Sequence, residues 1–181
     1  MKPYEIDIPS DALARQALKK VDYQDAYAIQ LPLEQPVDPK DMVLLFFDCI
    51  PSWFGVLIAI RQLVAGWMGL KTGEKSDFQE SLDAFQGQPG ESIAMFHVLD
   101  RTEEELLMGE NDRHLDFRLA FVSKKMEKGS ELSLVTTVQF NNWLGKLYFI
   151  PVGPVHRLIV PILLRRMARR LLATHQGPAT K

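Results

Sequence analysis

The spacing of hydrophobic residues changes near Glu91, from a helical period to an alternating one. Before this point apolar residues recur about every 3.6 positions, whereas after it they alternate with polar residues, as in strands with one buried face. The clearest alternation lies between residues 113 and 122, where one face carries Leu115, Phe117, Leu119 and Phe121. The pattern therefore predicts helices in the first half of the chain and a sheet in the second.

The helices of the first half are marked by caps and prolines. The sequence predicts helices at residues 10–19, 39–49 and 52–66, a short helix from Ser76, and one strand at residues 26–31. Asp38 and Pro39 supply an N-cap and a proline in the first turn. The apolar segment 42–70 is interrupted by charges, and its longest uncharged stretch is shorter than the roughly 18 residues of a membrane-spanning helix. We therefore expect two buried helices there.

Four consecutive antiparallel strands are predicted in the second half, at residues 93–99, 104–109, 113–122 and 132–140. A turn at residues 127–130 joins the last two. Asp116 and Arg118 alternate with the apolar face of their strand. We expect them to form a cross-strand charge ladder with Glu131 and Glu105.

The C-terminal region predicts one long helix, from Pro154 to about Ala173, with a kink or a doubly buried turn at Pro161. Its second part is amphipathic. The apolar stripe is Val160, Leu164, Met167 and Leu171, and the charged face is Arg165, Arg166, Arg169 and Arg170. We expect the stripe to dock on the sheet and the arginines to stay in solvent, where they either favour the helix C-terminus or attach the protein to an anionic membrane surface.

Composition limits the class of protein. The chain has 181 residues, of which 46% are hydrophobic and 24% charged, as expected of one globular α+β domain spanning residues 1–181. The net charge of -2 argues against a nucleic-acid partner. A single cysteine, Cys49, and an N-terminus unlike a signal peptide favour the cytoplasm. The histidines show no ligand spacing and no catalytic motif occurs, so we expect no metal and no cofactor.

Two stretches of the sequence resemble a known family. They are Asp112–Arg118 and residues 140–161, FNNWLGKLYFIPVGPVHRLIVP. Both resemble an uncharacterised bacterial family of domains of unknown function, assigned to the START-like helix-grip superfamily (Bet-v-type, polyketide-cyclase-like, SRPBCC), and the resemblance begins at about Tyr23. It implies an antiparallel sheet wrapped around a long C-terminal helix, with a cavity between them in which relatives hold lipids or polyketides. It implies no catalytic residues.

The inward alternation of the strands, together with this fold, predicts binding or carriage of a small apolar molecule. Its cavity is expected to be lined by Trp53, Phe96, Val98, Leu115, Phe117, Leu119, Leu134, Thr136, Val138, Phe140, Trp143 and Tyr148. Asn142 and His156 are the polar groups expected to orient the ligand.

The alternative is an enzyme of the cyclase or dehydratase type, in which His156, Tyr148 and Asn142 move protons on the bound molecule. Two of these groups would then converge within hydrogen-bond reach across an open pocket. Each also has a purely structural explanation: His156 can bond to the preceding loop, and Asn142 and Tyr148 can serve in loop capping and helix packing. Binding ranks above catalysis because no residue pair has the spacing of a known catalytic device.

Overall fold

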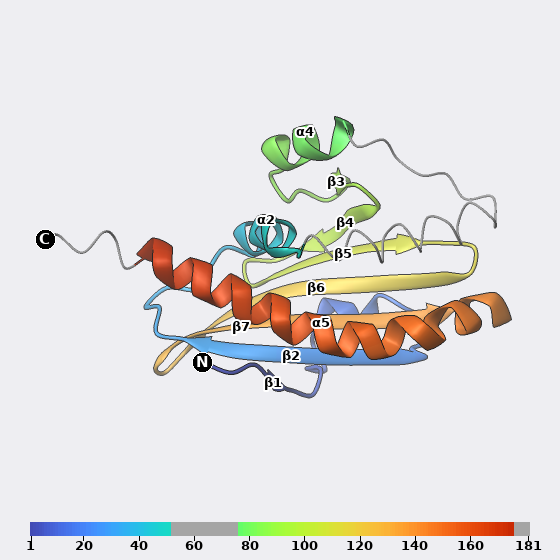
Figure 1. The fold of residues 1–181 in the computed structure, drawn as a ribbon, viewed down its shortest axis with the longest axis horizontal. Coiled ribbons are helices and arrows are strands. Elements are labelled where there is room, and N and C mark those ends of the chain that lie inside the picture. The colour runs from blue at the N-terminus through green and yellow to red at the C-terminus, as the bar shows by residue number, and fades with distance from the viewer. Residues whose placement is uncertain (52–75, 176–181) are drawn as a thin grey trace, which may run out of the picture.

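The structure, a computed structural model, describes residues 1–51 and 76–175. In these residues an antiparallel sheet of seven strands carries a long C-terminal helix across one face (Figure 1). The strand order across the sheet is β1-β2-β7-β6-β5-β4-β3. The α+β class is therefore confirmed, and the arrangement of sheet and helix is consistent with a helix-grip fold.

The elements have the following bounds. The strands are β1 (Tyr4–Glu5), β2 (Tyr23–Leu31), β3 (Ser92–Ile93), β4 (Phe96–Arg101), β5 (Glu105–Asn111), β6 (Leu115–Met126) and β7 (Gly129–Phe140). The helices are α1 (Leu13–Gln16), α2 (Pro39–Cys49), α4 (Ser76–Ala84) and α5 (Trp143–His175).

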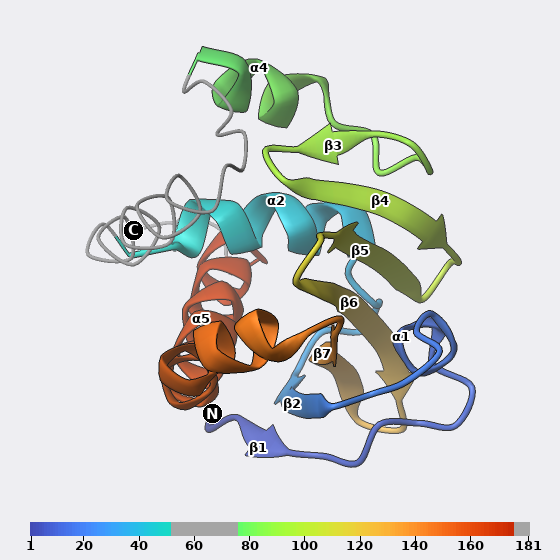
Figure 2. The ribbon, with the colours of Figure 1, turned by 90° about the vertical axis from the view of Figure 1, so that its right-hand side faces the viewer.

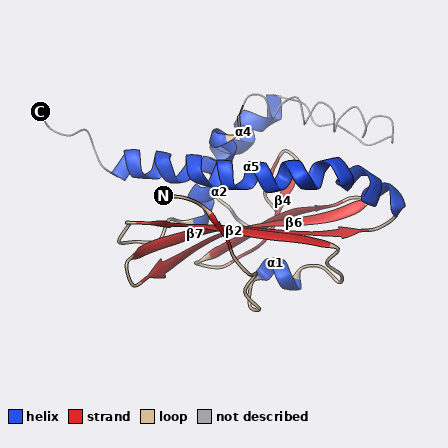
Figure 3. Cartoon of the chain, turned by 60° about the horizontal axis from the view of Figure 1, so that its bottom comes forward, coloured by secondary structure: helices blue, strands red, loops and turns tan. Residues whose placement is uncertain are grey.

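The two faces of the sheet bury separate cores. Helices α2 and α5 lie on one face and α1 on the other (Figure 3). The larger core, under α2 and α5, includes Phe121 and Leu134, whereas the smaller core, under α1, includes Ala120 and Val135. Neighbouring residues of a strand point to opposite faces, so the alternation read from the sequence places its large apolar side chains under the two long helices.

Strand β2 lies inside the sheet, between β1 and β7. Its register sets Tyr23 opposite Val138 and Asp25 opposite Thr136. Helix α5 packs on β2, β7 and α2, as the end view in Figure 2 shows. The first long strand and the last helix, far apart in the sequence, are thus direct neighbours.

The predicted helices of the first half agree with the structure to different degrees. Helix α2 has the predicted bounds, and the Asp38 carboxylate accepts a hydrogen bond from the backbone N–H of Lys40 at 2.7 Å. The predicted helix at residues 10–19 is wrong in extent, because α1 has only four residues and Ser10 does not cap it. Its first backbone N–H groups donate instead to the buried carboxylate of Glu105. The helix predicted at residues 52–66 lies outside the described residues.

The meander from β4 to β7 is confirmed, with β5, β6 and β7 longer than expected and β4 shorter. The strand predicted at residues 93–99 is divided into β3 and β4 by a tight turn, in which Ala94 has a φ of 53°. Strand β2 begins at Tyr23, three residues before its predicted start, and β1 was not predicted.

The predicted charge ladder is wrong. The residues opposite Asp116 and Arg118 on β7 are Gln139 and Thr137, not Glu131. Arg118 is only 7% exposed, and its guanidinium donates to two backbone carbonyls and to the Asn111 side chain at 2.7 Å. Burial lowers the pKa of this guanidinium. Arg118 therefore fastens the β5–β6 pair and does not form a surface ion pair.

Helix α5 begins at Trp143, well before the predicted start at Pro154, and three prolines lie inside it. The side-chain oxygen of Asn142 accepts hydrogen bonds from the backbone N–H groups of Leu144 and Gly145, which satisfies donors of the first turn. Of the predicted apolar stripe, Val160, Leu164 and Met167 are buried, the last two with 0% exposure, and Leu171 is half-buried.

The four C-terminal arginines are exposed, as expected. Two of them also contact the end of α2. Arg166 donates to the backbone carbonyl of Cys49 at 3.3 Å, and Arg170 pairs with Asp48. Arg165 and Arg169 are therefore the more outward-facing pair.

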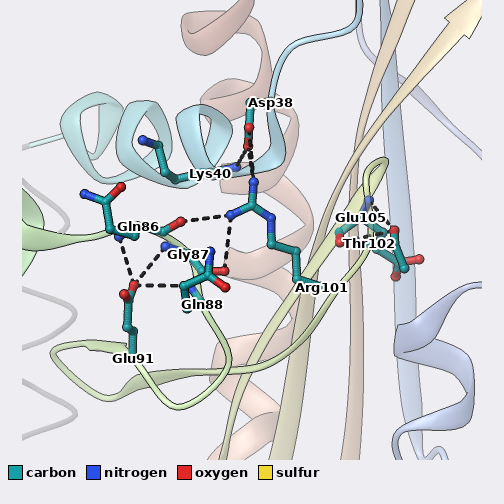
Figure 4. A network of polar contacts seen from close by, with 9 residues as sticks. All are labelled: Asp38, Lys40, Gln86, Gly87, Gln88, Glu91, Arg101, Thr102 and Glu105. Atoms are coloured by element: carbon teal, nitrogen blue, oxygen red, sulfur yellow. Dashed lines mark hydrogen bonds and ion pairs between the residues drawn. The ribbon is translucent and has the colours of Figure 1, made fainter.

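A polar network joins the start of α2, the loop after α4 and strand β4 (Figure 4). The Arg101 guanidinium donates to both carboxylate oxygens of Asp38, at 3.0 and 3.1 Å, and to the backbone carbonyl of Gln86 at 2.8 Å. One oxygen of Glu91 accepts from three consecutive backbone N–H groups, those of residues 86–88. The network fixes the loop against the rest of the domain.

Candidate functional site

A polar cluster lies in the apolar layer between the sheet and α5. Nδ1 of His156, on α5, lies 2.8 Å from Oδ2 of Asp25, on β2, and the Tyr23 hydroxyl donates to the same oxygen. The Thr136 hydroxyl oxygen, on β7, lies 3.5 Å from Nε2 of His156. The four residues meet because Asp25 and Thr136 are cross-strand neighbours on the face that α5 covers.

One oxygen of this cluster is buried without a partner. Asp25 is 5% exposed, and its Oδ1 accepts no hydrogen bond from residues 1–51 or 76–175. Buried acceptors are normally satisfied, because leaving one unpaired costs about 1–3 kcal/mol. The His156 side chain is 24% exposed, so the cluster extends from the interior to the surface. A hydrogen-bond donor that reached Oδ1 would complete the site.

The Asp25 carboxylate is held in its ionised form. Burial alone would raise the pKa of Asp25, but the hydrogen bond and charge of His156, together with the Tyr23 and Thr136 hydroxyls, outweigh it. The pKa of Asp25 is therefore below its ordinary value. Burial, together with the bond to Asp25, raises the pKa of Tyr23. Tyr23 thus remains a donor and Asp25 a charged acceptor at neutral pH.

Half-buried aromatic rings border the cluster. The Tyr23 and Phe149 ring centroids are 4.6 Å apart, and those of Phe149 and Phe140 are 5.3 Å apart. The exposed Arg157 guanidinium lies 5.4 Å from the centroid of the Tyr23 ring. An apolar surface therefore adjoins the buried carboxylate where the first half of α5 crosses the sheet.

The residues predicted to line the cavity are distributed as follows. Buried are Val98, Leu119, Leu134, Thr136 and Val138, and half-buried are Phe96, Leu115, Phe117, Phe140 and Tyr148. Trp143 is 70% exposed, so its ring points to solvent. Trp53 lies outside the described residues.

Of the polar candidates, His156 belongs to the cluster and Asn142 belongs to the start of α5. Besides capping the helix, the Asn142 side chain contacts Nδ1 of the buried His114 and donates to the backbone carbonyl of Arg113. His156 has different partners, Asp25 and Thr136. In the described part of the chain, the interactions of Asn142 thus support its structural explanation.

Two hollows among the described residues lie elsewhere. One, of about 570 Å³ and open to solvent, is lined by Asp38, Gln88, Pro89, Arg101, Thr102 and Glu103. A smaller one, of about 50 Å³, is lined on the α1 face by Ile6, Pro9, Asp11, Ala12, Glu105, Val122, Lys124, Glu131, Ser133 and Val135. Neither shares a residue with the predicted lining, and the cavity under α5 stays a prediction.

Sequence reasoning missed Tyr23 and Asp25, because the predicted strand began at residue 26. A usable signal was present in the alternation of Tyr23, Asp25, Tyr27, Ile29 and Leu31. That register puts an acidic residue on an otherwise apolar strand face, which marks a buried charge.

The family model described as "Protein of unknown function (DUF2867)" matches residues 17–163, which is most of the chain. The chain belongs to this family. The DUF2867 match contains all four members of the polar cluster, Tyr23, Asp25, Thr136 and His156, and it ends within α5. No curated protein and no solved structure matches the chain.

Proposed function

We propose that this DUF2867 domain binds a small apolar molecule carrying one hydrogen-bond donor, such as a hydroxyl or an amine, on the α5 face of the sheet. The observation that carries the proposal is the buried, unpaired Oδ1 of Asp25. His156 keeps this carboxylate ionised, so it favours a donor and disfavours an anionic head group. The Asp25 carboxylate would thereby select molecules whose polar end is a hydrogen-bond donor.

The apolar part of the molecule would contact the aromatic rings beside the cluster. Tyr23, Phe140 and Phe149 are half-buried, so each can still gain by covering its remaining apolar surface. A sheet with a long C-terminal helix across it also supports membership of the START-like superfamily, in which the ligand lies between these two elements.

A second candidate, an enzyme that moves protons on the bound molecule, is favoured by the order of groups around His156. A hydroxyl faces one ring nitrogen and a carboxylate faces the other, at 3.5 and 2.8 Å. A carboxylate in this position orients the imidazole ring and stabilises its protonated form, as a general base requires. Binding ranks higher because Thr136 is only 5% exposed, so the ring nitrogen that faces its hydroxyl has little access to a reacting molecule.

Native mass spectrometry of the purified protein, followed by extraction of any bound molecule, tests the proposal directly. In parallel, binding of 1-dodecanol, dodecylamine and dodecanoate is compared by displacement of a fluorescent apolar probe. We expect the alcohol and the amine to bind at least about tenfold more tightly than the carboxylate. Asp25→Asn should reduce this preference.

His97→Gln is the matched control for His156→Gln, because His97 is a half-exposed histidine that pairs with Glu110 near the opposite edge of the sheet. Binding should weaken in His156→Gln and not in His97→Gln. Equal binding by the two variants, or tighter binding of dodecanoate, would contradict the proposal. A change in the mass of a bound molecule during incubation, lost in His156→Gln, would favour the enzyme.

A further inference from the structure

The outward side of α5 carries a row of large apolar side chains in solvent. Trp143, Leu147, Ile150, Leu158 and Ile162 are 70%, 56%, 68%, 69% and 45% exposed. Their spacing is helical, so they form one ridge, roughly 28 Å long at 1.5 Å per residue. We call these five residues the apolar ridge. Continuous apolar patches of this kind mark protein or membrane contacts.

The same side of the helix continues as a basic surface. Arg165 and Arg169 follow Ile162 at helical spacing and are exposed, and residues 143–175 include no Asp or Glu. Lys146, which is also exposed, adds a further positive charge to the first part of the helix. An apolar row on a helix that carries cations and no acidic residue, in a chain whose net charge is -2, is complementary to an apolar surface that bears negative charge.

We propose that the apolar ridge, with Arg165 and Arg169, docks the domain onto the surface of an anionic lipid bilayer, with α5 lying parallel to it. The ridge would enter the interface, and the guanidinium groups would contact lipid phosphates. This inference stands on the outward face of α5 and does not depend on the ligand proposed for the inward face.

Two other arrangements fit the structure less well. By length and composition α5 could cross a membrane, because an 18-residue stretch of it has a mean hydropathy of 1.7. However, Val160, Leu164 and Met167 on its inward side are buried in the core that the sheet shares with α2, and a helix fixed in this way lies on a membrane surface. A second copy docked ridge to ridge would bring the two basic surfaces of α5 together with no acidic residue of the helix to pair them.

The test is co-sedimentation of the whole protein with vesicles made of equal parts phosphatidylcholine and phosphatidylserine, compared with vesicles of phosphatidylcholine alone. We expect binding to the anionic vesicles, weakening as salt rises. Leu158→Asp and the double variant Arg165→Glu/Arg169→Glu should each lower the partition coefficient by about tenfold or more. The matched controls are Leu99→Asp and Lys125→Glu/Lys128→Glu, at exposed positions away from α5, and these should leave binding unchanged.

Circular dichroism establishes that each variant is folded, and fluorescence adds an independent measurement. Trp143 should shift its emission to the blue on vesicle binding, and Trp143→Phe should lose that shift while still sedimenting. The proposal is overturned if the protein ignores anionic vesicles, binds neutral ones equally well, or loses as much binding in the controls as in the ridge variants. A dimer that Leu158→Asp converts to a monomer would assign the ridge to a second copy.

Discussion

Nδ1 of His156 lies 2.8 Å from Oδ2 of Asp25, although the two residues are 131 positions apart in the sequence. The contact joins the helix-facing side of β2 to α5, in a layer that is otherwise apolar. Because Asp25 is almost fully buried, its charge is stabilised mainly by the His156 ring and by neighbouring hydroxyl groups.

Removing one member of this pair should lower the free energy of unfolding more than replacing both members with apolar residues. His156→Ala leaves a buried carboxylate without its imidazole partner, and we expect a loss of about 3 kcal/mol in the free energy of unfolding. Asp25→Leu combined with His156→Leu should recover part of that loss. Urea unfolding measures all three proteins, and His97→Ala, at a half-exposed pair, is the control with an expected change below about 1 kcal/mol.

Stability should fall at acidic pH, partly through Asp25. The folded-state pKa of Asp25 is below the value of about 3.9 for an unfolded aspartate, so the folded state binds this proton less readily. Its contribution is therefore fully present above that value and is lost as the pH falls through the folded-state pKa. Melting temperatures measured from pH 7 downward should decline less steeply below about pH 4 in Asp25→Asn than in the unmodified protein. If the melting temperatures of the two proteins decline in parallel, Asp25 does not contribute to the loss of stability at acidic pH.

Local patterns predicted the parts of this fold whose structure is determined locally. Alternation placed β4 to β7, and the Asp38–Pro39 signal placed α2, because burial of one strand face and helix capping both depend on nearby residues. The start of α5 was wrong because Pro154 reads as a helix opening, whereas the structure tolerates it inside the helix and Asn142 supplies the cap. The cytoplasmic location, the ligand and the membrane contact stay predictions.

The pairing of β2 with β7, and with it the Asp25–His156 site, could not be predicted in this way. Which strands become neighbours depends on how the whole sheet closes, and the periodicity of one segment carries no information on its partner. His156 was named as a candidate from its residue type and its place near the start of the predicted helix. Its carboxylate partner, Asp25, lies just before the predicted strand and inside the observed one, which begins at Tyr23.

The inward and outward faces of α5 should respond very differently to substitution. Leu164→Ala should lower the free energy of unfolding by roughly 2 to 5 kcal/mol, because Leu164 is 0% exposed in the larger core. Arg169→Ala should change it by less than about 1 kcal/mol, because its guanidinium is exposed. Chemical denaturation of both variants decides the matter, and greater sensitivity at Arg169 would mean that the helix faces the other way.

Gly145 holds the first turn of α5 against the start of β6. A β-carbon there would lie 2.0 Å from the backbone oxygen of His114, which cannot move aside as a side chain could. Alanine normally improves a helix by about 1 kcal/mol relative to glycine, but here the clash should outweigh that gain. We expect Gly145→Ala to lower the melting temperature more than Gly153→Ala, where the nearest atom belongs to the Phe149 ring at 3.1 Å. Equal effects would show that the two segments can separate freely.

The position of β2 between β1 and β7 also affects how the chain can be made. During synthesis β2 leaves the ribosome long before β7, the strand that will cover its inner edge, and Asp25 emerges 131 residues before His156. The hairpins from β4 to β7 can form as they emerge, whereas the closing of β2 onto β7 requires a long loop and must come late. Until then the nascent chain presents an unpaired apolar strand edge, the kind of surface that chaperones bind and that aggregation exploits.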